Sequence, residues 1–170
     1  GDLPPSAQEI YQHVSGVHGI LSLLTDKIDA ALMDAAGSQL RVISNYAVGY
    51  NNIDIAAAKK RGIAVGNTPG ILTDATADFA FALMLSAGRR IVEADQYVRN
   101  GNWQTWGPSI LLGSDFATAT LGLIGFGRIG LAMAKRAAGF NMRVLFYDPT
   151  AQEEANAHSV DLNTLLREAD

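Results

Sequence analysis

A glycine-rich stretch is the part of this chain whose residue types and spacing fit a definite chemistry. An apolar run leads into the pattern G-x-G-x-x-G, formed by Gly125, Gly127 and Gly130. In such a turn one glycine permits the bend, one lets the backbone approach a pyrophosphate, and one lets the helix pack closely on the strand. The helix start offers unpaired N–H groups and the positive end of its dipole, so we expect Arg128 and Ile129 to contact the phosphates. The pattern therefore predicts a dinucleotide site.

An acidic residue at the end of the next apolar run completes this pattern. Asp148 follows the glycines by roughly 20 residues, which is where a ribose-binding acid belongs. A carboxylate accepts hydrogen bonds from the ribose hydroxyls of NAD and repels the 2′-phosphate of NADP, and residues 147–150 include no Arg or Lys. The sequence therefore favours NAD over NADP. The alternatives are a glycine-rich turn in another kind of α/β unit and, for Asp148, a helix cap after the strand.

Apolar runs alternate with segments of helical period along the chain, which is typical of βαβ units and a mainly parallel sheet. The expected strands cover residues 19–24, 40–44, 63–65 and 142–147, besides the one before the glycines. The expected helices cover residues 6–14, 29–36, 54–61 and 128–140. The sequence thus predicts an α/β fold.

One long helix is expected to join two α/β regions. It runs from Thr73 or Asp74 to Arg99, and Asp74 can cap it. Residues 100–114 then form an irregular connector. After Pro149 we expect a short helix, a loop that contains His158, a short extended piece at 159–161, and a last helix that ends at residue 170.

The bulk properties exclude several classes of protein. The chain has 170 residues, a net charge of −4 and a pI near 5.3, which argues against nucleic acid and anionic membrane surfaces as partners. It has no cysteine, so disulfides and thiolate metal sites are absent. The longest apolar run, residues 79–85, is far shorter than a membrane-spanning helix, and the first residues do not form a signal peptide. We expect a soluble, cytoplasmic protein with no metal site.

Four segments in order, residues 21–29, 42–54, 67–78 and 120–130, resemble the D-isomer-specific 2-hydroxyacid dehydrogenases, particularly the glyoxylate/hydroxypyruvate reductase branch. The resemblance implies a flavodoxin-like substrate domain that lacks its first strand, followed by the first half of a Rossmann NAD-binding domain. The two would cover residues 1–101 and 102–170, with a small 2-oxo acid bound between them.

The resemblance also implies substrate-binding residues. The backbone of Val48 and Gly49 would hold the substrate carboxylate, because adjacent N–H groups in a turn can bind an anion. The alternative is a plain glycine turn before a helix. Leu23 would border the substrate together with Leu24, although core packing is the interpretation we favour for this pair.

Three further residues gain a predicted role from the resemblance. Asn45 and Tyr46 would line the substrate cleft, and Tyr46 could equally be a half-buried aromatic residue. Thr76 would lie near the nicotinamide end of the cofactor. Its alternative is an ordinary polar residue in the first turn of the long helix.

The resemblance implies an NAD-dependent reduction of glyoxylate or hydroxypyruvate to the D-2-hydroxy acid. The family takes its acid–base His–Glu pair and an Arg from the second half of the cofactor domain, which we expect to follow residue 170. No catalytic residue is therefore assigned, and we expect an internal fragment that is inactive alone. The histidines of this chain, His13, His18 and His158, do not match the family's position.

The same scaffold can also carry other functions. A non-catalytic NAD-sensing or interaction protein is the alternative of a different class. Among catalytic relatives, phosphoglycerate and formate dehydrogenases match less well. Trp103 and Trp106 lie where the family dimerises, so we expect a homodimer, although two tryptophans in a connector can simply cover the core.

Overall fold

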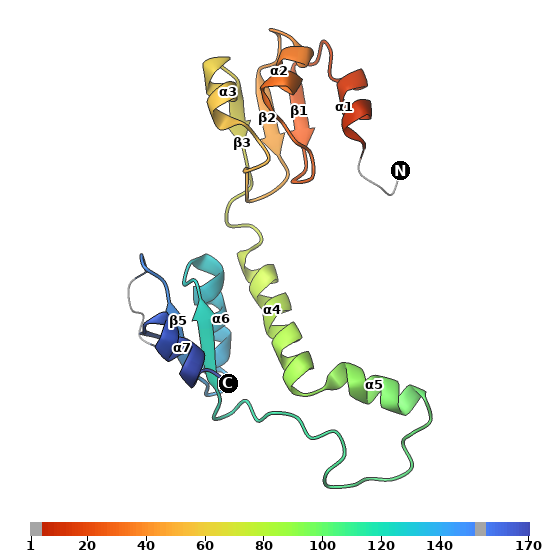
Figure 1. Cartoon of the computed structure of the whole chain (residues 1–170), viewed down its shortest axis with the longest axis vertical. Coiled ribbons are helices and arrows are strands. Elements are labelled where there is room, and N and C mark those ends of the chain that lie inside the picture. Colours follow the sequence, from red (N-terminus) through yellow and green to blue (C-terminus); the bar gives the residue numbers. More distant parts are fainter. Residues whose placement is uncertain (1–4, 152–155) are drawn as a thin grey trace. The chain divides into compact units, whose positions relative to one another are not determined.

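The chain folds into two α/β units. The computed structural model describes residues 5–151 and 156–170, and the contacts within it separate Gly1–Leu72 from Thr73–Asp170. Each unit is built on a three-stranded sheet whose strands are all parallel. Figure 1 shows the helices beside these sheets. The α/β fold with parallel sheets is thus confirmed, and the functional domain boundary after residue 101 stays a prediction.

The first unit alternates helices with the strands of its sheet, in the order β1-β2-β3. Ser22, the last residue of β1, lies opposite Asn45, the last residue of β2, so the strands end at a common edge. The elements are α1 (Ala7–His13), β1 (Gly19–Ser22), α2 (Ala30–Ala36), β2 (Val42–Asn45), α3 (Ile55–Lys60) and β3 (Ala64–Gly66).

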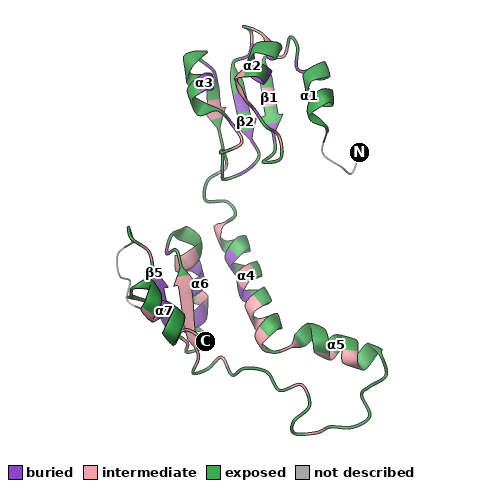
Figure 2. Ribbon diagram, viewed as in Figure 1, coloured by how far each residue is buried: buried purple, intermediate pink, exposed green. Residues whose placement is uncertain are grey.

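The two inner helices of this unit start at aspartates that cap them. Asp29 Oδ1 accepts from the Leu32 N–H at 3.0 Å and Asp54 Oδ1 from the Ala57 N–H at 2.8 Å, which satisfies an otherwise unpaired donor in each helix. Behind the caps, Leu32 and Ala58 are buried in the core of the unit. Figure 2 shows this core as buried positions on β2 and the helices around it.

The second unit contains the glycine pattern and has the strand order β4-β5-β6. Its core lies between α4, α6 and the sheet, where Phe81 of α4 meets Phe140 with ring centres 5.1 Å apart. The elements are α4 (Thr73–Gly88), α5 (Ile91–Arg99), β4 (Thr120–Ile124), α6 (Arg128–Ala138), β5 (Arg143–Tyr147), β6 (His158–Ser159) and α7 (Leu162–Glu168).

The single long helix predicted from residue 73 or 74 to 99 is wrong, because two helices occupy this range. Arg90 adopts a left-handed backbone with φ 55°, which ends the helical path between α4 and α5. The carbonyl of Gly88 accepts from the Ser114 N–H at 2.8 Å instead of continuing the helix ladder. Gly113 passes so close that a Cβ there would lie 2.5 Å from the same carbonyl oxygen. The returning connector therefore stabilises the break.

Two smaller expectations need correction. Helix α4 begins at Thr73, so Asp74 lies in its first turn and is not its cap. His158 lies in β6, paired with Leu145 of β5, and not in a loop. The short helix expected after Pro149 lies mostly outside the described residues.

Candidate functional site

The three glycines of the pattern perform different steric tasks. Gly125 has φ +93°, a conformation that L side chains rarely adopt. A Cβ on Gly130 would lie 2.6 Å from the carbonyl oxygen of Gly125, so the first turn of α6 packs directly on the end of β4. A Cβ on Gly127 would meet nothing within 4 Å. The bend and the close packing are thus as predicted, and Gly127 leaves open space in front of the helix start.

The residue between the first two glycines anchors the turn in the core. Phe126 is buried and stacks on Phe146 of β5, with ring centres 3.9 Å apart and an angle of 12° between the rings. The Gly125 N–H also donates to the Tyr147 carbonyl at 2.9 Å. The backbone N–H groups around it are therefore held in a fixed place.

The carboxylate of Asp148 joins this turn to the end of β5. Its Oδ2 accepts from the Phe126 N–H at 2.8 Å. Its Oδ1 accepts from the N–H and the hydroxyl of Thr150, at 2.8 and 2.9 Å, and from the Ala151 N–H at 3.1 Å. These donors, the Phe126 N–H foremost, lower the pKa of Asp148 to about 2. The residue is therefore an anion at neutral pH.

The bonds of Asp148 bear on both of its proposed roles. The contacts from Thr150 and Ala151 are those of a cap on the following segment, so the capping interpretation holds for Oδ1. Oδ2 accepts a single bond in the described structure, which leaves it room for a ribose hydroxyl. Contact with ribose stays a prediction.

The start of α6 faces outward from this turn. Gly127 is the N-cap residue, and Arg128 and Ile129 in the first helical turn are exposed. The helix has 11 residues and its last turn carries Lys135 and Arg136, so its dipole is complemented at the far end. The geometry suits an anion bound beside Gly127, at the positive end of the helix.

The predicted carboxylate-binding turn has its carbonyls occupied and its amides open. In the turn of residues 47–50, the Ala47 carbonyl accepts from the Thr68 N–H at 2.9 Å, and the Tyr50 carbonyl accepts from the Ile53 N–H at 3.0 Å. The carbonyls of Val48 and Gly49 accept from asparagine side chains, each at 2.8 Å. Among the described residues, no protein acceptor pairs with the N–H of Val48 or Gly49. A turn of this kind can bind an anion.

The side chains predicted to line the substrate cleft differ in how far they are exposed to solvent. Tyr46 is 73% exposed, so the half-buried alternative is wrong. Leu23 and Leu24 are 44% and 54% exposed, so the core packing we favoured for them is wrong as well. Asn45 is fully buried, and its side chain therefore does not face solvent beside the turn.

Thr76 lies exposed in the first turn of α4, which fits both interpretations of it. A contact that the sequence reasoning missed joins this helix to α6. Arg136 Nε donates to Asp78 Oδ1 at 2.6 Å, and a second nitrogen donates to the Asp74 carbonyl at 3.2 Å. The aspartates raise the pKa of the Arg136 guanidinium, Asp78 foremost. These bonds fix the helix that carries Thr76 against the helix that begins at the glycines.

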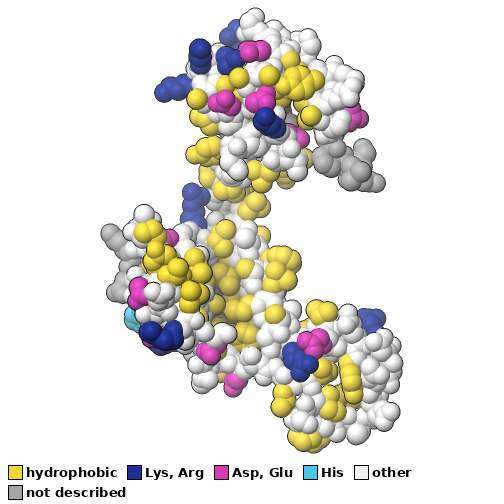
Figure 3. All heavy atoms as spheres, in the orientation of Figure 1, with side chains coloured by type: hydrophobic (Ala, Val, Ile, Leu, Met, Phe, Trp, Pro, Cys, Tyr) yellow, Lys and Arg dark blue, Asp and Glu magenta, His cyan; other side chains and the backbone are white. Residues whose placement is uncertain are grey.

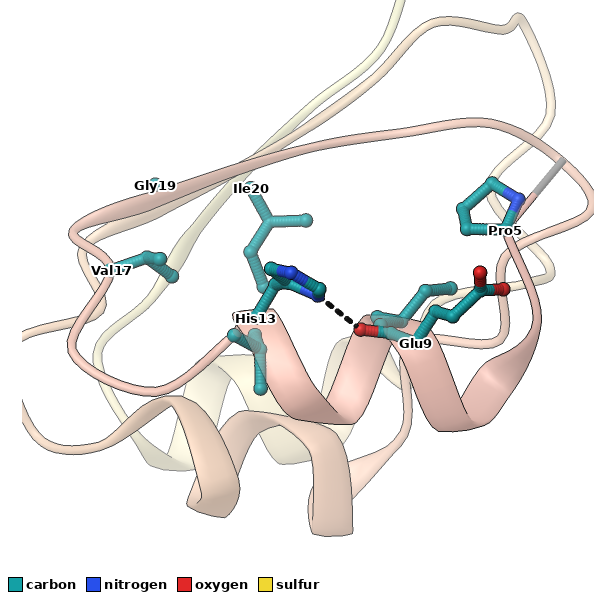
Figure 4. A pocket seen from close by; sticks show the side chains of 8 residues that line it. Pro5, Glu9, His13, Val17, Gly19 and Ile20 are labelled. Carbon is teal, nitrogen blue, oxygen red and sulfur yellow. Dashed lines mark hydrogen bonds between the residues drawn. The ribbon is translucent and has the colours of Figure 1, made fainter. Parts of the chain in front are cut away.

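A mainly apolar cavity of about 430 Å³ lies apart from these residues, between α1 and β1 (Figure 4). Its polar groups are engaged locally. His13 Nδ1 bonds the Glu9 carbonyl at 2.8 Å, and the Glu9 carboxylate accepts from Ser6 in a capping box. Local bonds thus engage His13 Nδ1 and the Glu9 carboxylate.

Metal-binding clusters and membrane-spanning helices are both absent from residues 5–151 and 156–170. These residues hold no group of three or more His, Asp or Glu side chains arranged to bind a metal ion. No helix among them has the length and apolar character needed to cross a membrane.

The chain is thus an α/β protein in which a G-x-G-x-x-G turn leads into α6, and in which the turn of residues 47–50 follows β2. The sequence profile of the D-isomer specific 2-hydroxyacid dehydrogenase catalytic domain matches residues 2–163. The chain belongs to this family.

Named relatives agree with this assignment. A glyoxylate reductase of Korarchaeum cryptofilum is 51% identical over 99% of this chain and 52% of its own length. The TT0316 protein of Thermus thermophilus has a TM-score of 0.95 at 45% identity, with 99% of this chain and 53% of that one covered. A D-lactate dehydrogenase of Aquifex aeolicus complexed with NAD and lactic acid has a TM-score of 0.82 at 28% identity, with 99% and 49% covered. The chain thus spans about half the length of the relatives it matches.

Proposed function

We propose that this chain supplies the dinucleotide turn and the carboxylate-binding turn of an oxidoreductase that reduces a small 2-oxo acid to a D-2-hydroxy acid. The observation that carries the proposal is the glycine turn bonded to an ionised Asp148. The names of the relatives, glyoxylate reductase, support glyoxylate as the substrate, and hydroxypyruvate is proposed beside it from the family resemblance. They give no support to a non-catalytic NAD sensor.

The residues present fit a nicotinamide dinucleotide. Gly127 keeps open space where a Cβ would obstruct a pyrophosphate, and the N–H groups that begin α6 would hold its oxygens. When bound, such a cofactor supplies the hydride. Oδ2 of Asp148 would accept from a ribose hydroxyl, and its charge would repel a 2′-phosphate, so we propose NAD as the preferred form. Thr76 is proposed to lie toward the nicotinamide.

The chain's own part in the reaction is to bind and orient. The N–H groups of Val48 and Gly49 would hold the substrate carboxylate, with Leu23 beside it. No acid–base residue is assigned among the described residues. The functional domains are proposed to be residues 1–101 and 102–170. A cytoplasmic location is proposed as well, and the absence of cysteine from the sequence is compatible with it.

An exposed apolar arm supports a homodimer as part of this proposal. In the second unit, exposed apolar side chains line α5 and the connector after it, and Figure 3 shows hydrophobic atoms on this part of the surface. Exposed apolar patches of this kind mark interaction sites. The arm is defined by Ile91, Val92, Val98, Trp103, Trp106 and Leu112.

Backbone NMR with two ligands tests the proposed function. In ¹⁵N-labelled chain, NADH should shift the amides of residues 125–130, and glyoxylate should shift those of Val48 and Gly49. Glycolaldehyde, which lacks the carboxylate, is the matched control and should leave Val48 and Gly49 unshifted. Equal shifts with glyoxylate and glycolaldehyde, or none with either, would contradict the assignment of the 47–50 turn.

A further inference from the structure

Two buried polar side chains lie directly behind the 47–50 turn. Ser22 and Asn45 are 1% and 0% exposed, and they are the buried polar residues of the described chain. Buried polar groups cost free energy unless they are hydrogen-bonded, and these two are bonded to each other, Ser22 Oγ to Asn45 Oδ1 at 2.8 Å. Asn52 completes the cluster, and we call Ser22, Asn45 and Asn52 the amide network.

Backbone carbonyls fix the direction of every bond in the amide network. Asn52 Nδ2 donates to the carbonyls of Leu23 and Asp26, both at 3.0 Å. Because a carbonyl can only accept, the atom of Asn52 that points toward them must be its nitrogen, and its oxygen is left to accept from Asn45. Asn45 Nδ2 then donates to Asn52 Oδ1 at 3.1 Å and to the Gly49 carbonyl at 2.8 Å. The Oδ1 of Asn45 accepts from Ser22 Oγ at 2.8 Å and from Asn52 Nδ2 at 3.2 Å.

The result is that the Val48 and Gly49 carbonyls are bound by protein donors, whereas their N–H groups have no protein acceptor among the described residues. Asn45 holds the carbonyl of Gly49 from inside, and exposed Asn67 holds the carbonyl of Val48 with its Nδ2 at 2.8 Å. With the carbonyls engaged on protein donors, the N–H groups of Val48 and Gly49 remain open to a ligand in the described structure. An anion is bound well by amides that need no rearrangement when it arrives.

We propose that Asn45 is a positioning residue: through the amide network it holds the Gly49 carbonyl and so presents the Val48 and Gly49 N–H groups to a carboxylate. This inference rests on the proposed function of the turn. The sequence predicted that the Asn45 side chain lines the substrate cleft. Because this side chain is fully buried, we propose that it acts instead through the backbone that it holds.

Two substitutions separate this role from general stability. Asn45→Asp keeps the shape of the side chain but removes both donors, so the Gly49 carbonyl loses its partner. Ser22→Ala removes one of the two donors to Asn45 Oδ1, leaves Asn52 Nδ2 as the other, and is the milder change. Asn51→Asp, the same chemical change at an exposed place in the next turn, is the matched control. Met33→Ala opens a cavity in the core of the same unit and controls for lost stability.

The readout is the ¹⁵N order parameter of Val48 and Gly49 in the full chain without ligand. We expect rigid values of about 0.85 in the wild type and values below about 0.6 in Asn45→Asp, with a smaller fall in Ser22→Ala. Asn51→Asp and Met33→Ala should keep wild-type values at both residues. Wild-type order parameters in folded Asn45→Asp would overturn the inference; if that variant does not fold, unchanged values in Ser22→Ala would overturn it.

A glyoxylate titration of the same proteins keeps the two proposals apart. If the wild type binds glyoxylate at Val48 and Gly49, Asn45→Asp should weaken binding about tenfold while Met33→Ala does not. If the wild type does not bind glyoxylate, the proposed function of the turn fails, and the order parameters still decide whether Asn45 holds it. Equal glyoxylate affinity in wild type and Asn45→Asp would contradict the positioning role.

Discussion

The backbone N–H of Phe126 donates to Oδ2 of Asp148 at 2.8 Å and so joins the glycine turn to the end of the neighbouring strand. The acid that we propose to bind the ribose thus also supports the turn that we propose to bind the pyrophosphate. A substitution at Asp148 is therefore expected to affect stability and cofactor preference together. Its partner in this bond carries the ring that stacks on Phe146.

The first prediction concerns cofactor choice. Asp148→Asn keeps the size of the side chain and removes its charge, so NADH binding should weaken about tenfold while NADPH binding does not, because the repulsion of the 2′-phosphate is gone. Fluorescence titration with each cofactor measures the ratio. Asp161→Asn, which alters the cap of α7, is the control and should keep the wild-type ratio. Equal affinities for NADH and NADPH in the wild type would refute the role of Asp148.

The second prediction concerns pH. The pKa of Asp148 falls from an ordinary 3.8 to about 2 in the folded protein, so its ionised form stabilises the fold. That contribution is complete above about pH 4 and is lost as the pH falls through about 2. Asp148→Asn leaves one acceptor oxygen in place of two, so it cannot accept from both the Phe126 N–H and the Thr150 N–H, and it should be less stable than wild type at pH 7. Denaturant unfolding should show this difference shrink toward pH 2; a constant difference would contradict the low pKa.

The third prediction separates two glycines of one turn. Gly130→Ala forces a Cβ to within 2.6 Å of the Gly125 carbonyl oxygen, so it should cost about 1–3 kcal/mol of stability, as overpacking does. Gly127→Ala meets nothing within 4 Å and should melt close to the wild type. Thermal unfolding of the two variants measures this. Equal loss in both would mean that the turn differs from the one described.

The fourth prediction concerns the exposed arm. Trp106 is 73% exposed, and if the arm is the dimer contact, Trp106→Ser should raise the dimer dissociation constant at least about tenfold. Sedimentation velocity over a range of concentrations gives that constant. Tyr11→Ser on α1, where the ring is 42% exposed, is the control and should leave it unchanged. A wild type that stays monomeric at all concentrations would exclude the dimer.

The glycine turn could be predicted from the sequence because its requirements are local. The need for a positive φ at Gly125 and for a missing side chain at Gly130 follows from sterics that a short pattern already encodes. The parallel order of the strands followed from their alternation with helices in the same way.

Features that depend on distant partners could not be predicted in this way. The break between α4 and α5 depends on Ser114, which returns to bond Gly88 from the connector. The burial of Asn45 depends on Ser22 and Asn52, which reach it from β1 and from the following turn. The sequence did carry one signal: Ser22 and Asn45 are polar residues at the ends of adjacent apolar strands, and such residues at a buried edge need each other as partners.

The proposed cofactor site is tested most directly by calorimetric titration of NADH into the wild type and into Gly127→Ala. The alanine fills the open space at the start of α6 without touching the surrounding structure, so both proteins should fold alike. We predict that the wild type binds NADH and that Gly127→Ala binds it at least about tenfold more weakly. No binding by the wild type, or equal binding by both proteins, would contradict the assignment of the glycine turn.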